Sequence, residues 1–487
     1  MTKIKDNINT NNKADKKADN EAEVLKNQLF VKKENCWDIQ SEDQDKIFEF
    51  AEGYKKALNY GKTERRFIQY TVEQLEIAGF KHLTEFEKIE NGNKVYATIH
   101  DKILVAALIG TEVPKNGFNI VASHIDSPRL DLKPNPLIEE NELVYFKTHY
   151  YGGIKKYHWL STQLALHGVI YLSDGKRVEI NVGDDPEDPV FTVTDLLPHL
   201  DYHRANKKIT EYVEGEKLQV LIGSIPYPDK DISERFKLGI LNLLNEKYGI
   251  KEADFNRAEI EVVPAHFARD VGFDRSMIGA YGQDDRVCAY TSLQALLDTE
   301  SVTKTAVILF ADKEEIGSDG NTGAQSQVFQ YLLNTLHEKI IGREPSMQEI
   351  QQFYLNTNLL SSDVTNAYDP IYAEVSDPVN SSYLSKGMSI NKYTGHAGKY
   401  GTNDANAEFV ACLTNLLDAN EIPYQISDMG KVDAGGGGTI AKYFATTGMN
   451  VIDCGVCMFA MHSCFEITSK IDVYNTYRAY KVFMTKG

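Results

Sequence analysis

The sequence has little of what marks secreted, membrane-spanning or disulfide-stabilised proteins. Its 487 residues include only six cysteines, which argues against a disulfide scaffold. No stretch approaches the ~18 consecutive apolar residues that a membrane helix needs. The opening stretch MTKIKDNINTNNKADKKADN contains no apolar core of a secretory signal. We therefore expect a cytoplasmic protein with no membrane partner.

Basic residues are also scarce relative to acidic ones. The chain has 52 lysines and arginines against 70 aspartates and glutamates, which gives a net charge of −18. This excess of negative charge repels the phosphates of nucleic acids and the anionic surfaces of membranes. We expect no nucleic-acid partner.

The length and the pattern along the chain indicate more than one domain. A single hydrophobic core stops growing near ~250–300 residues. Residues 1–25 are polar and are typical of a flexible tail, whereas the apolar–polar alternation around Asp174-Gly175 predicts a β-hairpin. We expect a β-rich insert over 128–260, within an α/β domain that spans 26–127 and 261–487.

Short apolar runs alternate with helical periodicity on both sides of the insert. Apolar residues recur at helical spacing between Ile47 and Leu58, TAVILF predicts a buried strand that ends at Phe310, and VFQYLLNTLHEKII predicts a helix. Such alternation is typical of an α/β fold, in which helices pack on both faces of a sheet.

Polar residues that can bind metal follow apolar runs at five places along the chain. In open α/β sheets the ligand crevice lies outside the carboxyl ends of the strands, so residues far apart in sequence can converge there. Singly, each residue has an ordinary explanation as a helix cap, a surface carboxylate or a satisfied histidine. Together, they form a ligand set that suits zinc, manganese or cobalt better than calcium. These residues are His124 and Asp126, Asp284 and Asp285, Glu314 and Glu315, Asp363, and His462.

Two of these residues, Glu314 and Glu315, are adjacent and carry the same charge just after a buried strand. In an apolar crevice their carboxylates would repel each other. They become stable there if one binds a divalent cation and the other faces the metal-bound water, where it can act as a base.

Several motifs together resemble the aspartyl aminopeptidase family, over nearly the whole chain. Four of them lie in the α/β part and two lie in the β-rich insert. The motifs are His-x-Asp-Ser-Pro at His124–Pro128, Glu-Glu-x-Gly-Ser at Glu314–Ser318, Ser-x-Asp at Ser361–Asp363, Met-His-Ser at Met461–Ser463, Tyr-Gly-Gly at Tyr151–Gly153, and Pro-His-Leu at Pro198–Leu200.

The resemblance implies a fold, an assembly and an activity. The fold would be a phosphorylase-like α/β/α catalytic domain interrupted by a β-rich dimerisation domain. The assembly would be a homo-oligomer, a tetrahedral dodecamer built from dimers. The activity would be that of a metalloaminopeptidase with two divalent ions per subunit, zinc first and manganese or cobalt as alternatives, acting on peptides with a free N-terminus.

By this resemblance, five residues would hold the two metal ions. His124 and Asp363 would bind one ion, and Glu315 and His462 would bind the other. Asp284 would bridge the two. The ions would also hold the scissile carbonyl and the free α-amine of the substrate, which limits the enzyme to N-terminal residues.

Three further residues would assist catalysis. Glu314 would take a proton from the water activated by both metals and deliver it to the leaving amine. Asp126 would orient His124, as a histidine ligand usually requires. His203, in the insert, would reach the active site of a neighbouring subunit and donate a hydrogen bond to the developing oxyanion.

The sequence departs from the family pattern near the residues that set side-chain selectivity. Asn366 and Asp369 stand where the family often has two histidines. Asn391 stands where lysine is usual, with Lys392 beside it. We therefore expect no strong preference for acidic N-terminal residues.

Two other functions are open at this point. A related di-metal deacylase or carboxypeptidase would use the same ligands. A catalytically silent assembly protein could keep the same fold, but it would be free to lose ligands, and every expected ligand and the base are present.

Overall fold

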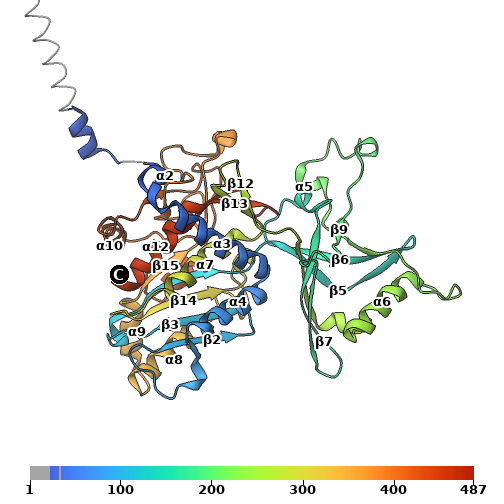
Figure 1. Cartoon of the computed structure of the whole chain (residues 1–487), viewed down its shortest axis with the longest axis horizontal. Coiled ribbons are helices and arrows are strands. Elements are labelled where there is room, and N and C mark those ends of the chain that lie inside the picture. Colours follow the sequence, from blue (N-terminus) through green and yellow to red (C-terminus); the bar gives the residue numbers. More distant parts are fainter. Residues whose placement is uncertain (1–21, 32–33) are drawn as a thin grey trace, which may run out of the picture.

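The computed structural model describes residues 22–31 and 34–487 and has two lobes (Figure 1). The larger one, which we call the α/β lobe, combines the first and last parts of the described chain around a central sheet. The smaller one, which we call the β-rich lobe, is formed by 129–264. The predicted flexible tail over 1–25 lies outside the described residues except for its last four positions, which are helical.

A nine-stranded sheet forms the centre of the α/β lobe. Its middle strands β14, β4, β15 and β19 run parallel to one another. Every residue of β4 and β14 is buried, as expected for strands that are covered on both faces. In order across the sheet, the strands are β1 (Lys81–His82), β2 (Lys94–Ile99), β3 (Ile103–Leu108), β14 (Ala306–Ala311), β4 (Asn119–His124), β15 (Asn358–Ser362), β19 (Asn450–Gly455), β17 (Met388–Asn391) and β18 (Tyr424–Ser427).

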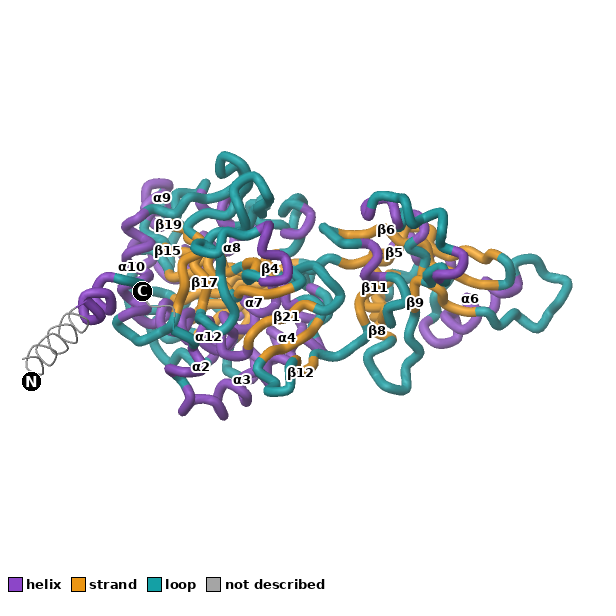
Figure 2. Tube along the Cα trace, turned by 90° about the horizontal axis from the view of Figure 1, so that it is seen from above, coloured by secondary structure: helices purple, strands orange, loops and turns teal. Residues whose placement is uncertain are grey.

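Helices pack on both faces of this sheet, and Figure 2 shows the strands enclosed between them. Alternate residues of β14 face opposite layers, because Ile308 packs in one apolar core and Val307 in the other. The first layer contains α3 (Gln44–Tyr60), α4 (Glu64–Ile77), α7 (Gln283–Leu297), α10 (Ala407–Asp418) and α12 (Lys470–Lys486). The second contains α8 (Val328–Ile341), α9 (Met347–Leu355) and α11 (Ala441–Ala445). This arrangement confirms the predicted α/β fold class.

Local sequence explains how the first two long helices form. The apolar residues between Ile47 and Leu58 lie on one buried face of α3. Thr63 caps α4 by accepting a hydrogen bond from the backbone N–H of Arg66 at 3.4 Å. The chain leaves this helix through Gly79, whose φ of 86° is unfavourable for other residues. The short α2 (Cys36–Ile39) packs against α3 and α12 through Cys36.

A separate five-stranded sheet lies within the α/β lobe. It places two loops that matter for the site, since β13 leads into α7 and β20 leads to the loop that contains His462. Its strands in order are β12 (Arg269–Val271), β13 (Met277–Ala280), β21 (Glu466–Ser469), β20 (Cys457–Phe459) and β16 (Thr365–Asn366).

The β-rich lobe consists of a seven-stranded sheet packed against α6 (Arg235–Tyr248), with the short α5 (Ile209–Tyr212) beside it. The predicted hairpin around Asp174-Gly175 joins β7 to β8. In order, the strands are β8 (Arg177–Val182), β7 (Leu164–Tyr171), β11 (Ala258–Pro264), β5 (Arg129–Glu140), β6 (Leu143–Tyr151), β10 (Val220–Gly223) and β9 (Thr192–Val193). The predicted insert begins one residue before β5 and ends inside β11, and its role in dimerisation stays a prediction.

Charged residues fill the junction between the two lobes. The guanidinium of Arg129, at the start of β5, lies 3.4 Å from Glu64 Oε2 and 3.5 Å from Glu261 Oε2. All three residues are buried. On another part of the junction, Lys62 Nζ lies 2.8 Å from Asp184 Oδ1. Buried charges are stable only when paired, so these contacts fix how the lobes meet.

No helix within 22–31 and 34–487 is long and apolar enough to span a membrane. The long helices α3 and α12 have 17 residues each. The predicted cytoplasmic location and the predicted lack of nucleic-acid and membrane partners stay predictions.

Candidate metal centre

Four of the predicted site residues stand at, or just after, the carboxyl ends of parallel strands in the central sheet. His124 is the last residue of β4, and Asp363 directly follows β15. Glu314 and Glu315 lie in a 3₁₀ turn after β14. Because β14, β4 and β15 are parallel neighbours, their carboxyl ends open on the same side of the sheet. The sheet therefore brings these residues to one crevice.

The other two predicted ligands flank the five-stranded sheet: Asp284 lies in the first turn of α7 and His462 lies in the loop after β20. One carboxylate holds both segments. Oε2 of Glu466 accepts a hydrogen bond from the backbone N–H of Asp284 at 3.2 Å, and Oε1 accepts one from that of His462 at 2.8 Å. His462 has a φ of 65°, which is uncommon for a residue other than glycine. Glu466 is not among the site residues predicted from the sequence, although it stands four residues after His462.

Asp284 is the shared member of two three-residue groups. Its Oδ1 lies 3.1 Å from His124 Nε2, and its Oδ2 lies 3.1 Å from His462 Nε2. His124 Nε2 is 3.7 Å from Asp363 Oδ1, and His462 Nε2 is 3.4 Å from Glu315 Oε2. In each group the ligand atoms lie within 4.8 Å of one another, close enough to share one ion. These groups contain the same residues as the two ligand sets that the resemblance implied.

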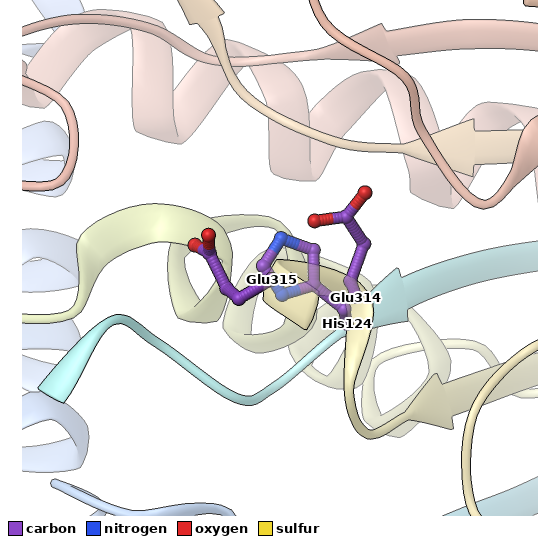
Figure 3. A group of neighbouring side chains, drawn as sticks. All are labelled: His124, Glu314 and Glu315. Atoms are coloured by element: carbon purple, nitrogen blue, oxygen red, sulfur yellow. The ribbon is translucent and has the colours of Figure 1, made fainter. Parts of the chain in front are cut away.

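Glu314 lies beside these groups and forms a third one with His124 and Glu315. In Figure 3 the imidazole of His124 lies between the carboxylates of Glu314 and Glu315, which extend to different sides of the ring. The two glutamates are neighbours in sequence, and their carboxylates approach the ring of His124 from different sides. This divergence allows one to bind a metal while the other faces water.

The electrostatics of the crevice favour bound cations. Burial raises the pKa of the Glu314 carboxyl to about 8, and burial together with the charge of Asp284 raises the pKa of Glu315 well above its ordinary range. Burial alone would lower the pKa of His124, but hydrogen bonds to Asp126 and Asp284 raise it. Oε1 of Glu315 is buried and accepts no hydrogen bond from any described residue. A divalent ion would neutralise these carboxylates, so the residues fit zinc.

Asp126 lies where it can orient both His124 and the glutamate turn. Its Oδ1 is 3.3 Å from His124 Nδ1 and accepts a hydrogen bond from the backbone N–H of Glu314 at 3.1 Å. Its Oδ2 accepts one from the backbone N–H of Glu315 at 3.2 Å. Because Nδ1 of His124 faces this carboxylate, Nε2 is left for a metal.

His203 does not lie with the other predicted site residues. It is exposed in the loop between η5 (Pro198–Leu200) and α5 of the β-rich lobe. Within the described chain it belongs to none of the candidate metal-binding groups. A role in the site of a neighbouring subunit therefore stays a prediction.

Comparisons with known proteins identify a family of zinc metalloproteases. Residues 57–484 match the family model of the aminopeptidase I zinc metalloproteases (M18). The chain is 47% identical over 456 residues to a probable M18 family aminopeptidase 1 of Borrelia garinii subsp. bavariensis, a match that covers 93% of this chain and 99% of the relative.

Solved structures show the same fold. The crystal structure of an M18 family aminopeptidase from Thermotoga maritima is similar with a TM-score of 0.91 and 46% identity, covering 94% of this chain and 100% of that one. The S. cerevisiae mApe1 dodecamer is similar in fold, with a TM-score of 0.72 and 20% identity, covering 89% and 95% of the two chains.

The closer likenesses extend over both lobes, since they cover more than nine-tenths of this chain. They confirm the resemblance that the motifs indicated, and the family's metal agrees with the nitrogen and oxygen donors that the crevice brings together. The chain therefore belongs to the M18 family of zinc metalloaminopeptidases, hydrolases that act on peptides.

Proposed function

We propose that this chain removes N-terminal residues from peptides with the help of two divalent ions that five side chains hold. The observation that carries the proposal is the position of Asp284, whose two carboxylate oxygens each lie 3.1 Å from a different histidine. A carboxylate in that position can bridge two ions. Imidazole and carboxylate are ligands of zinc, and manganese and cobalt stay alternatives.

Glu314 is the proposed general base. When bound, the ions supply Lewis-acid chemistry to the scissile carbonyl and to water. Glu314 takes a proton from the attacking water and then delivers it to the leaving amine. Its burial favours this role, since burial raises the pKa of the carboxyl and so makes its ionised form a stronger proton acceptor than an exposed glutamate. Asp126 keeps His124 and the Glu314 turn in place.

The proposed substrates are peptides with a free N-terminus and no strong preference for an acidic first residue. Asn391 supports the absence of an acidic preference, because its side chain is neutral and 2% exposed. Its amide donates to the backbone oxygen and to Oγ of Ser427, both at 3.3 Å. It is therefore engaged within the chain, whereas a lysine there could pair with a substrate carboxylate. Lys392, next to it, is exposed.

We propose that catalysis also needs a neighbouring subunit, in a tetrahedral dodecamer built from dimers. The similar mApe1 structure is a dodecamer. Apolar side chains near His203 are exposed, with Leu200 at 58% and Tyr202 at 77%, as expected of a surface that another copy covers. There, His203 would donate a hydrogen bond to the developing oxyanion, a contribution of ~2.7–4 kcal/mol.

Mixed oligomers test the shared site. His203→Ala and Glu314→Gln subunits should each be nearly inactive alone. Refolded together, they should regain partial activity, because some sites would combine an intact Glu314 with an intact His203 from a neighbour. Full activity of His203→Ala alone, or no recovery in verified mixed oligomers, would refute the shared site.

Metal content and substrate class together test the proposed function. Elemental mass spectrometry of the purified chain should give two divalent ions per subunit. Aminoacyl fluorogenic substrates should be cleaved, the cleavage should stop with chelator, and N-acylated and carboxypeptidase substrates should not be cleaved. Turnover of only the N-acyl or C-terminal substrates would identify a deacylase or carboxypeptidase. No turnover of any substrate by metal-loaded oligomers would identify a silent assembly protein.

A further inference from the structure

Three consecutive residues of the β-rich lobe reach the metal centre of the same chain. They lie at the end of β6, and each approaches a different site residue. The hydroxyl of Tyr151 donates a hydrogen bond to Asp126 Oδ2 at 2.8 Å. A Cβ atom on Gly152 would lie 3.3 Å from the Cβ of Glu315. The backbone oxygen of Gly153 lies 3.1 Å from Nδ1 of His462.

The hydroxyl of Tyr151 fixes a carboxylate that has several tasks. Asp126 is fully buried. Its two oxygens face Nδ1 of His124 and accept the backbone N–H groups of Glu314 and Glu315. Tyr151 adds the only side-chain hydroxyl that donates to this carboxylate among the described residues. A carboxylate held from several directions cannot rotate, so the ring of His124 keeps one orientation.

Tyr151 is itself held in place by the charged junction between the lobes. The guanidinium of Arg129 lies 3.9 Å from the centre of the Tyr151 ring. These two residues are also paired in register between β5 and β6. Arg129 is in turn paired with Glu64 and Glu261. The stacked guanidinium keeps the ring from moving away from Asp126.

Gly153 has the corresponding role for the second histidine. Its backbone oxygen accepts from Nδ1 of His462, which leaves Nε2 free to face Asp284 and Glu315. The space there is tight, since a Cβ atom on Gly153 would lie 3.3 Å from Nδ1 of that ring. Gly153, unlike Gly152, does not have a positive φ. An alanine at this position would therefore add a steric contact without straining the backbone.

We infer that the turn Tyr151–Gly153 is a positioning element for both metal-binding histidines, so that the β-rich lobe completes the metal centre of its own chain. Tyr151 acts through Asp126 on the ion held by His124, and Gly153 acts directly on the ring of His462. The inference rests on the ligand sets of the proposed function. It adds a second task to the β-rich lobe, separate from any contact with another subunit.

The zinc affinity of each site measures this positioning without relying on catalysis. Tyr151→Phe removes the hydroxyl but keeps the ring that stacks on Arg129. Competition with a chromogenic chelator should show that one of the two zinc ions binds ~10–100-fold more weakly. The thermal unfolding of the metal-free chain should stay as in the wild type. Tyr150→Phe is the matched control, because Tyr150 is the neighbouring residue and is 43% exposed, and it should leave both affinities unchanged.

Gly153→Ala should lower the affinity for the other zinc ion, because the added methyl group would push the ring of His462 out of position. Crystals soaked in limiting chelator show which ion is lost in each variant. We expect Tyr151→Phe to lose the ion beside His124 and Gly153→Ala to lose the one beside His462. Wild-type affinity for both ions in both variants would overturn the inference, as would loss of the same ion in both.

The outcome is distinguishable from a failure of the proposed function. A wild-type chain that binds two zinc ions at these residues but cleaves no aminoacyl substrate would refute the proposed function alone. The zinc affinities of the two variants would still decide the positioning inference. A wild-type chain whose zinc ions lie at other residues would refute both.

Discussion

Both lobes have apolar cores, and they differ in which other side chains they bury or expose near the proposed functional residues. The α/β lobe buries charged and polar side chains at one edge of its central sheet, among them His124, Asp126 and Asp284. The β-rich lobe buries an apolar core around Trp159 and exposes apolar side chains in the loops near His203. Buried charge needs partners of opposite sign, and exposed apolar surface needs a cover. The first property suits a metal centre, and the second suits association with another copy.

A few buried residues at the junction connect the two lobes. Arg129 pairs with buried carboxylates of both lobes and stacks on Tyr151, which holds Asp126. A fold can therefore place a candidate metal centre and an exposed apolar surface in different lobes and still connect them through a few contacts.

The largest expected effect concerns the chemistry of the α/β lobe alone. Glu314→Gln should lower kcat by ~10²–10⁴-fold, because an amide cannot take the proton from water. Zinc content and thermal unfolding should stay unchanged, since Glu314 belongs to neither ligand group around Asp284. Glu300→Gln, on an exposed residue, is the control. Near-wild-type turnover of Glu314→Gln would show that Glu314 is not the general base.

The next largest effect concerns the free energy of unfolding, to which the buried ion pairs between the lobes should contribute more than exposed ion pairs. Arg129→Met leaves Glu64 and Glu261 buried without their shared cation, and breaking a buried pair costs ~3–5 kcal/mol of the free energy of unfolding. Arg343→Met breaks an exposed pair with Glu349 and should change stability little. Denaturant unfolding of both variants measures the difference. Equal stabilities would mean that the lobes do not depend on this junction.

Side-chain selectivity should show a smaller effect. Aspartyl and glutamyl substrates should not exceed leucyl and alanyl ones by a hundredfold in kcat/KM, because Asn391 is neutral and engaged with Ser427. Asn391→Lys should raise the relative turnover of acidic substrates. A hundredfold acidic preference in the wild type would show that another cation, such as Lys392, faces the substrate.

The smallest effect concerns the pH dependence of the junction. Burial alone would raise the pKa of Asp184, but contacts with His167 and Lys62 lower it from its usual 3.8 to about 2. A lowered pKa in the folded state adds stability above the usual value, and this stability is lost as the pH falls from about 4 towards 2. One pKa unit corresponds to about 1.4 kcal/mol, so the loss is at most about 2.5 kcal/mol.

Asp184→Asn isolates this contribution. The wild type should lose more stability than the variant between pH 5 and pH 2, as measured by denaturant unfolding at each pH. At pH 2 the two chains should approach each other in stability. If the stabilities of wild type and variant change in parallel over this range, the contacts of Asp184 with His167 and Lys62 contribute nothing to the pH dependence.

Much of the fold and of the candidate site could be predicted, for a local reason. The runs that end at Phe310 and His124 are apolar because both faces of their strands are covered, and polar residues follow because the carboxyl ends open on a crevice. A helix cap such as Thr63 is likewise set by its neighbours in sequence. Features that depend on short stretches of sequence are visible without a structure.

The supporting contacts could not be predicted, because they join residues that are far apart. Tyr151 meets Asp126, and Gly153 meets His462, only after the two lobes have folded together. Gly153 contributes a backbone oxygen. Every residue has one, so the residue type gives no sign of this contact. Glu466 accepts hydrogen bonds from the backbone of two segments, at Asp284 and His462. The role predicted for His203 needs a second copy, which a single chain does not contain.

Anomalous diffraction at the zinc edge tests the central claim most directly. Crystals of the zinc-loaded wild type should show two anomalous peaks per subunit. One peak should contact His124 and Asp363, the other should contact Glu315 and His462, and Asp284 should contact both. A single peak, or two peaks that do not share Asp284, would contradict the account.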